Sequence, residues 1–171
     1  MTGPSRGMIP RMQGAALLDI DTFEEVEHDA SATGQAAAVV ALVAVAQAIG
    51  GAGDGLLAAG GAAIGALLGW GVWAGVTYLV GTKLFQGTAT WGELLRTLGF
   101  AQAPGILAFL GIIPILGVVV LILPIWILVT GFVAVRQALD IGNGATFLTI
   151  LVGWGAYVAL AFLGGILSFI F

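Results

Sequence analysis

Between residues 31 and 171 the chain consists of long apolar stretches that are almost free of charged residues. Five stretches are each long enough to cross the roughly 30 Å hydrocarbon core of a bilayer as a helix. They cover about residues 31–49, 56–80, 94–113, 118–135 and 146–171. Hydrophobic residues make up 60% of the sequence and charged residues 8%, whereas soluble domains hold roughly half and a quarter. The sequence therefore predicts an all-α integral membrane protein with five transmembrane helices.

Residues 1–30 form a separate N-terminal segment that is too polar for the hydrocarbon. Its apolar residues recur at the three- and four-residue spacing of one helical face. This stripe consists of Ile9, Met12, Ala16, Ile20 and Phe23. Thr22 followed by Glu25 has the spacing of a capping box, which would begin a second helix after Asp21. We expect two short amphipathic interfacial helices; the alternative is a disordered acidic tail, because its carboxylates repel one another.

The distribution of basic residues predicts the orientation. With five spans, all of them fall on the N-terminal side of the membrane; they are Arg6, Arg11, Lys83, Arg96 and Arg136. Cytoplasmic loops carry an excess of Lys and Arg. The sequence therefore predicts a cytoplasmic N-terminus and a C-terminus on the opposite side.

The sequence does not contain the residues that catalysis or cofactor binding would require. The chain has no cysteine and a single histidine, His28, and no nucleophile–base pair or paired carboxylates stand out. His28 lies among acidic residues, where a solvated helix face is the default and a metal ligand the alternative. Gly51–Gly55 is better interpreted as a turn than as a nucleotide cradle. We expect no catalytic residue, cofactor or metal, and the net charge of −4 argues against nucleic acid binding.

Two pairs of opposite charges flank the third and fourth spans on the N-terminal side. Glu93 and Arg96 are three residues apart, and Arg136 and Asp140 are four apart, so each pair can share a helical face. Their functional interpretation is a patch that binds a protein partner. The alternative is local charge neutralisation at helix ends.

Two prolines predict kinks in the third and fourth spans near the middle of the membrane. If Pro114 marks the turn between the third and fourth spans, Pro104 and Pro124 lie at equal depth. Each removes a backbone hydrogen bond, and the Gln102 amide is nearby. Broken helices at the midplane form binding sites in many transporters, although prolines can also be simple bends. Gln102, Pro104 and Pro124 are therefore candidates for a kinked cavity.

Gly61, Gly65 and Gly69 recur every four residues along the second span. Small residues at this spacing allow another helix to approach closely. The partner is either a helix of the same chain, which we favour, or a second copy in a homo-oligomer.

The run from Thr90 to Gly105, Thr-Trp-Gly-Glu-Leu-Leu-Arg-Thr-Leu-Gly-Phe-Ala-Gln-Ala-Pro-Gly, resembles the prokaryotic branch of the Yip1 domain family. The run from Ala134 to Asp140 and the segment from Leu17 to Ala36 are similar to it as well. The resemblance implies a five-span protein of the prokaryotic inner membrane with a cytoplasmic N-terminus. Eukaryotic relatives are membrane adaptors that bind lipidated Rab-type GTPases, but the Asp-Leu-Tyr-Gly-Pro run of those members is missing here.

From these observations we expect a non-enzymatic membrane adaptor or scaffold. A related version of this role is an accessory subunit of a larger membrane complex. Its partners would be membrane lipids and another membrane or cytoplasmic protein. The positions that match family motif residues are Glu93, Arg96, Gln102, Pro104, Arg136 and Asp140. The alternative is a small transporter or lipid-handling protein that uses the third and fourth spans.

Overall fold

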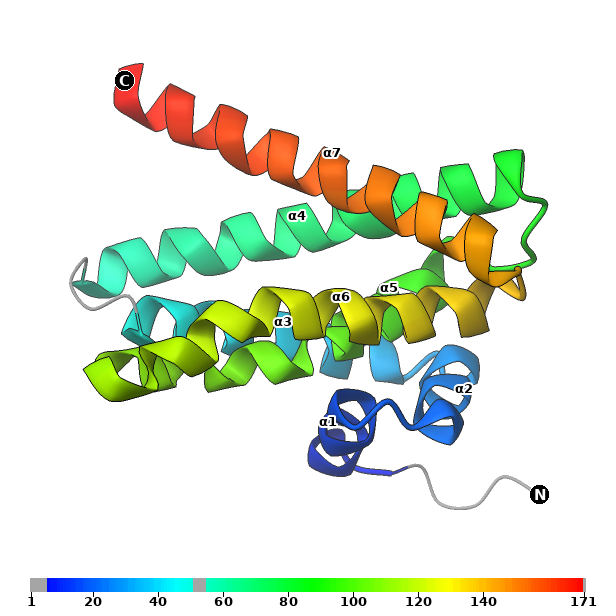
Figure 1. The fold of residues 1–171 in the computed structure, drawn as a ribbon, viewed down its shortest axis with the longest axis horizontal. Coiled ribbons are helices and arrows are strands. Elements are labelled where there is room, and N and C mark those ends of the chain that lie inside the picture. Colours follow the sequence, from blue (N-terminus) through cyan, green and yellow to red (C-terminus); the bar gives the residue numbers. More distant parts are fainter. Residues whose placement is uncertain (1–5, 51–54, 171) are drawn as a thin grey trace.

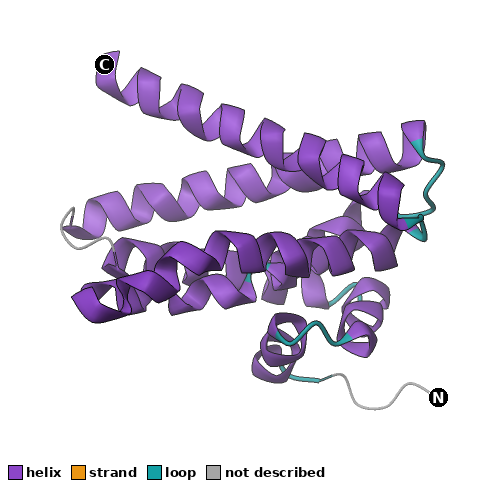
Figure 2. Ribbon diagram, in the orientation of Figure 1, coloured by secondary structure: helices purple, strands orange, loops and turns teal. Residues whose placement is uncertain are grey.

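The computed structural model describes the backbone of residues 6–50 and 55–170, and the side chains of these ranges except 55–59, 62, 157, 160–161 and 164–170. Every regular element in this part of the chain is a helix (Figure 2). The elements are α1 (Met8–Ala16), α2 (Ile20–His28), α3 (Ala32–Gly50), α4 (Gly55–Leu84), α5 (Trp91–Ala101), the 3-10 helices η1 (Ala103–Ile112) and η2 (Pro114–Leu116), α6 (Gly117–Leu139) and α7 (Asn143–Ile170).

Four segments of the described chain are long and apolar enough to cross a membrane. They are Ala32–Gly50, Ala63–Leu84, Trp91–Ile112 and Pro114–Leu139, and they agree with the first four predicted spans. The fifth predicted span falls on α7, which is a helix, and its crossing of the membrane remains a prediction. Residues 51–54, where we expected a glycine-rich turn, lie outside the described residues.

The long helices form a bundle in which two groups can be distinguished (Figure 1). In one group, α3 packs on α5 and η1, and these pack on α6. In the other, α4 packs along α7 and also contacts α3 and α5. The short helices α1 and α2 lie against the outer side of the first group, near the end where α6 finishes (Figure 1).

Glycines set the spacing inside the first group. A Cβ atom at Gly99 of α5 would lie 2.7 Å from the Ala36 Cβ of α3, and one at Gly105 of η1 would lie 2.7 Å from Val43 Cγ1. Real carbon atoms do not approach this closely. α3 can therefore lie directly along α5 and η1 only because these two positions lack a side chain.

The predicted glycine contacts on α4 involve Gly61, Gly65 and Gly69. A Cβ atom at Gly61 or Gly65 would meet no described atom within 4 Å. Gly69 is buried. Internal packing on Gly61 and Gly65 remains a prediction, because several side chains of α4 and α7 lie outside the described residues.

Element boundaries in the third and fourth spans differ from the prediction. The third span is not one α-helix: α5 ends at Ala101, and the chain continues as η1, which has Pro104 at its start. α6 extends to Leu139, so the predicted polar connection 138–145 shortens to the three residues before Asn143. Packing explains the extension, because Leu139 is fully buried and its carbonyl accepts from the Thr88 N–H at 3.1 Å.

The predicted capping box at Thr22 and Glu25 was wrong. α2 begins at Ile20 with Asp19 as its N-cap residue, and the Thr22 hydroxyl donates back to Asp19 Oδ2 at 2.6 Å. The capping box of this chain lies at the start of α5, where Thr90 and Glu93 exchange side-chain and backbone bonds.

Candidate functional site: the polar end and the N-terminal hairpin

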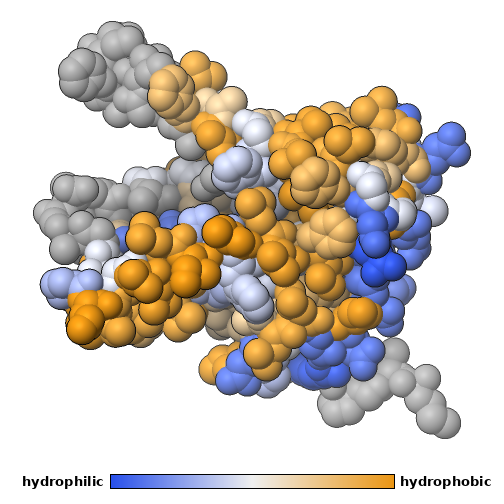
Figure 3. Space-filling model, in the orientation of Figure 1, coloured by the Kyte–Doolittle hydropathy of each residue, from blue (hydrophilic) through white to orange (hydrophobic). Residues whose placement is uncertain are grey.

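One end of the bundle collects the charged residues of the described chain. There α4 and α6 end, α5 begins, and hydrophilic residues gather, while the sides of the bundle are apolar (Figures 1 and 3). We refer to this region as the polar end, and to α1, α2 and their linker as the N-terminal hairpin. Four of the five basic residues lie at the polar end or in the N-terminal hairpin, and the fifth, Arg6, lies directly before α1.

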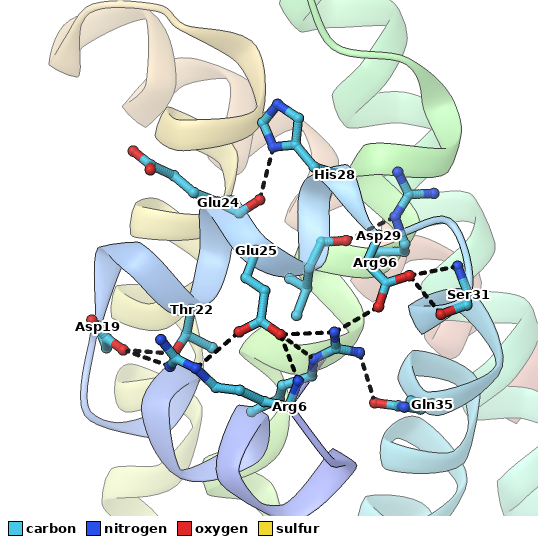
Figure 4. Close-up of polar contacts among 12 residues, drawn as sticks. Arg6, Asp19, Thr22, Glu24, Glu25, His28, Asp29, Ser31, Gln35 and Arg96 are labelled. Atoms are coloured by element: carbon cyan, nitrogen blue, oxygen red, sulfur yellow. Dashed lines mark hydrogen bonds and ion pairs between the residues drawn. The ribbon is translucent and has the colours of Figure 1, made fainter. Parts of the chain in front are cut away.

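Arg11 holds the N-terminal hairpin together. Its side chain is fully buried, and its Nη2 lies 2.8 Å from Glu25 Oε1 and 2.6 Å from Asp29 Oδ2. Its Nη1 donates to Gln35 Oε1 of α3 at 3.0 Å. Figure 4 shows Glu25, Asp29 and Gln35 converging on this point. A buried guanidinium is tolerated only when such partners compensate for its lost hydration, so Arg11 ties α1, α2 and α3 into one unit.

Hydrogen bonds favour the charged form of two carboxylates, Asp19 and Asp29. Hydrogen bonds from Ser31, followed by those from Arg11, lower the pKa of Asp29. The Thr22 hydroxyl lowers the pKa of Asp19, which also pairs with Arg6 at 3.5 Å. Each bond favours the ionised carboxylate over the protonated one. The ionic network of this region joins two arginines, Arg6 and Arg11, to three acidic residues, Asp19, Glu25 and Asp29.

Arg96 joins α5 to the end of α2. Its Nε donates to the Val26 carbonyl at 2.8 Å, and its Nη2 donates to the Glu27 carbonyl. The last carbonyls of a helix lack partners inside the helix, and cations suit its negative end. Arg96 is 8% exposed. Its guanidinium is therefore used inside the molecule, and Glu93 is used as the cap of α5; no ion pair joins these two described residues.

Arg136 and Asp140 are the more accessible pair. Arg136 is exposed on the last turn of α6. Asp140 follows in the left-handed conformation, with φ 53°, and its carboxylate accepts from the Thr88 hydroxyl at 3.3 Å. No ion pair between Arg136 and Asp140 forms in the described structure. Both side chains therefore remain available at the surface of the polar end.

The carboxyl group of Glu27 is partly buried and lies near other carboxylates at this end. Partial burial raises its pKa, and the carboxylates of Glu93, Asp140 and Glu24 raise it further. His28 acts in the opposite direction and donates through Nδ1 to the Glu24 carbonyl, at 2.8 Å. That bond, followed by Glu27, raises the pKa of His28. Arg96 contacts this part of α2 through the backbone carbonyls of Val26 and Glu27 and not through the Glu27 carboxylate.

The interruption between α5 and η1 is closed by packing. The Ala101 carbonyl accepts a bond from the Thr130 hydroxyl of α6 at 2.6 Å, and Pro104 and Gly105 are buried. Gln102 is half-buried at the junction. Pro124 lies within the continuous helix α6. The interruption of the third span near Pro104 agrees with the predicted kink, and a cavity at Gln102, Pro104 and Pro124 remains a prediction.

Sequence reasoning missed two contacts that, together with those of Arg96, seat the hairpin on the bundle. These are the Arg11 network and the bond from Trp126 Nε1 of α6 to the Ala16 carbonyl, at 2.9 Å. Arg11 and Ala15 are four residues apart and both fully buried, so the buried face of α1 contains the arginine. Within the described residues, no group of three His, Asp or Glu side chains is arranged to hold a metal.

A comparison with protein families adds to this geometry. The Yip1 domain matches residues 20–170, which is most of the chain. The chain belongs to the Yip1 domain family. The matched region begins at α2 and includes the whole bundle, so this is a multi-pass membrane protein of the Yip1 type, a family that is generally non-enzymatic. No curated protein and no solved structure is significantly similar to the chain.

Proposed function

We propose that this Yip1 domain protein is a non-enzymatic membrane adaptor or scaffold that binds a protein partner at its polar end, on the cytoplasmic side of the inner membrane. The observation that carries the proposal is the segregation of charge: the sides of the bundle are apolar, and the charged residues gather at the polar end and in the hairpin. A lipid-embedded protein recognises a water-soluble surface only where it offers such groups.

The accessible part of this surface combines both signs of charge. Arg136 and Asp140 are exposed at the end of α6, and Asp21 and Glu24 are exposed on the neighbouring helix α2. Gln137 of α6 donates to Glu24 at 3.4 Å, so the two helices form one continuous surface. Surfaces of mixed charge favour one orientation of a partner and reject mismatched ones. A role as accessory subunit of a larger complex uses the same surface.

Co-purification after gentle solubilisation tests the proposal. The wild-type chain is expected to bring down a partner in constant proportion. Arg136→Glu is expected to reduce that proportion at least about tenfold, because a like-charge contact at an interface costs several kcal/mol. Lys83→Glu is the charge-matched control, since Lys83 is exposed at the end of α4 outside the predicted patch. An unaccompanied wild-type protein, or equal partner recovery from all three proteins, would count against an adaptor.

A further inference from the structure

The N-terminal hairpin has two different outward faces. On α1 the exposed side chains are mostly apolar: Ile9 is 64% exposed, and Leu17, which follows the helix, is 79% exposed. Gln13 is the only polar side chain exposed on the outward face of α1. On α2 the exposed side chains include Asp21, Glu24 and His28. If both helices faced water, we would expect both to expose mainly polar side chains.

The position of α1 along the bundle indicates what covers its apolar face. Its Ala16 carbonyl is bound by Trp126, which lies within the apolar segment Pro114–Leu139 of 26 residues. At 1.5 Å per residue, that segment is about 39 Å long and Trp126 lies about 18 Å from its start. Whichever roughly 30 Å of this segment is in hydrocarbon, Trp126 is inside it.

A second anchor gives the depth of the other part of α1. Arg11 bonds Gln35, the fourth residue of the span Ala32–Gly50. This level lies about 5 Å inside the start of α3. α1 therefore extends from near the membrane boundary at Arg11 into the hydrocarbon at Ala16. On α6, which Trp126 links to α1, the apolar side chains of Ile122, Ile125 and Val129 are also exposed in the bundle.

The charges of the hairpin are compatible with this zone. Arg11 is the only charged residue of α1, and it is turned inward and neutralised by Glu25 and Asp29. Arg6 and Asp19, which are half exposed, pair with each other beside the helix. Helices that lie in the interfacial plane bury their apolar face a few ångströms into the boundary between headgroups and acyl chains.

We propose that α1 is immersed in the lipid leaflet on the N-terminal side, where Ile9 and Leu17 contact acyl chains, while α2 faces water. The occupant of the exposed α1 face is thus lipid rather than a protein. This goes beyond the adaptor role, because it assigns one helix of the hairpin to the membrane and leaves only the other to a partner.

Site-specific fluorescence tests this assignment, and the chain has no native cysteine to remove. Leu17→Cys, Ile9→Cys and, as the water-facing control, Glu24→Cys would each carry an environment-sensitive fluorophore in the purified full chain. The vesicles would contain phosphatidylcholine and phosphatidylglycerol, with either doxyl-labelled phosphatidylcholine or aqueous iodide as quencher. Doxyl lipid is expected to quench the Leu17 and Ile9 probes at least about threefold more than the Glu24 probe, with the reverse order for iodide, as for an interfacial helix.

Two outcomes would overturn the proposal. Iodide quenching at residues 9 and 17 equal to that at residue 24 would place α1 in water. Protection of residues 9 and 17 from both quenchers would show that protein covers them. The two positions lie on opposite ends of α1, so a fault in one variant does not decide the test. No partner is present in these vesicles, and failure here is therefore distinct from failure of the adaptor proposal.

Discussion

Single glycines decide how closely the spans of this bundle approach one another. We expect Gly99→Ala to destabilise the protein by about 1–3 kcal/mol, because the added methyl group overlaps with Ala36 of α3 and forces the backbones apart. Thermal unfolding in detergent measures the change. Gly65→Ala is the matched control in α4: a Cβ atom there meets nothing within 4 Å, so stability should stay constant or rise slightly. Equal shifts in both variants would contradict the packing argument.

Glu27 provides a residue-level prediction on pH. Burial, together with nearby carboxylates, raises its pKa in the folded protein, so the folded state binds the proton more tightly than the unfolded state. Stability from this group is therefore present at low pH and is lost as pH rises through the ordinary value, about 4.3, and then through the raised one. We expect Glu27→Gln to raise the unfolding temperature at pH 7 and to have less effect near pH 4.5.

The control variant replaces a different acidic residue of α2 and leaves the carboxylates around Glu27 in place. Asp21 is exposed in the first turn of α2, where a negative charge is favourable. Asp21→Asn should therefore give no gain at either pH. The prediction on Glu27 fails if both variants stabilise the protein equally at pH 7.

At the scale of elements, the hairpin is held together by ion pairs of unequal strength. Arg11→Gln leaves Glu25 and Asp29 without their buried partner, a loss typically of about 3–5 kcal/mol. Because α1 and α2 contribute only part of the fold, we expect the hairpin to detach while the bundle stays folded. Hydrogen exchange at the α1 amides would then accelerate by at least about a hundredfold.

Arg6→Gln is the control for the detached hairpin. Arg6 pairs with Asp19 and Glu25, but its own side chain is 45% exposed, and exposed pairs contribute at most about 1 kcal/mol. In the Arg6→Gln variant, the α1 amides should exchange less than about tenfold faster than in the wild type. Similar exchange in both variants would show that burial of Arg11 does not hold the hairpin.

The elements themselves could be predicted from the sequence more reliably than their ends. Long apolar runs specify α3, α4 and α6, because few other structures satisfy the backbone in lipid. The end of α5 could not be placed, since the change to η1 depends on Thr130 reaching the Ala101 carbonyl from another helix. The start of α2 was misplaced for a similar reason: Thr22 and Glu25 have the spacing of a cap, but Asp19 and Arg11 engage them.

The candidate site shows the same division between local and long-range information. Glu93, Arg96, Arg136 and Asp140 were correctly placed at one end of the bundle, because hydropathy and helix length fix that end. Their individual contacts were not predictable, since the partners of Arg96 on α2 are 69 and 70 residues away in sequence. In place of the predicted pairs, Arg96 bonds the docked hairpin, Glu93 caps α5 and Asp140 accepts from Thr88.

For the whole molecule, the crossing of α7 decides the number of spans. α7 has 28 residues, or about 42 Å at 1.5 Å per residue, which exceeds the roughly 30 Å hydrocarbon core. It begins at the polar end, beside the last turn of α6, and packs along α4 (Figure 1). α4 contains an apolar segment long enough to cross the membrane. A helix of this length that packs along α4 would itself have to cross.

We therefore expect Asn143 and a peptide tag added after residue 171 to lie on opposite sides of the membrane. In sealed right-side-out vesicles, an impermeant maleimide should leave Asn143→Cys unlabelled until the membrane is opened, while the tag is accessible to antibody at once. Gln86→Cys, exposed in the loop before α5, should behave like Asn143→Cys because both lie at the polar end. Accessibility of all three sites from one side would mean that α7 returns without crossing, and the membrane domain would then have four spans.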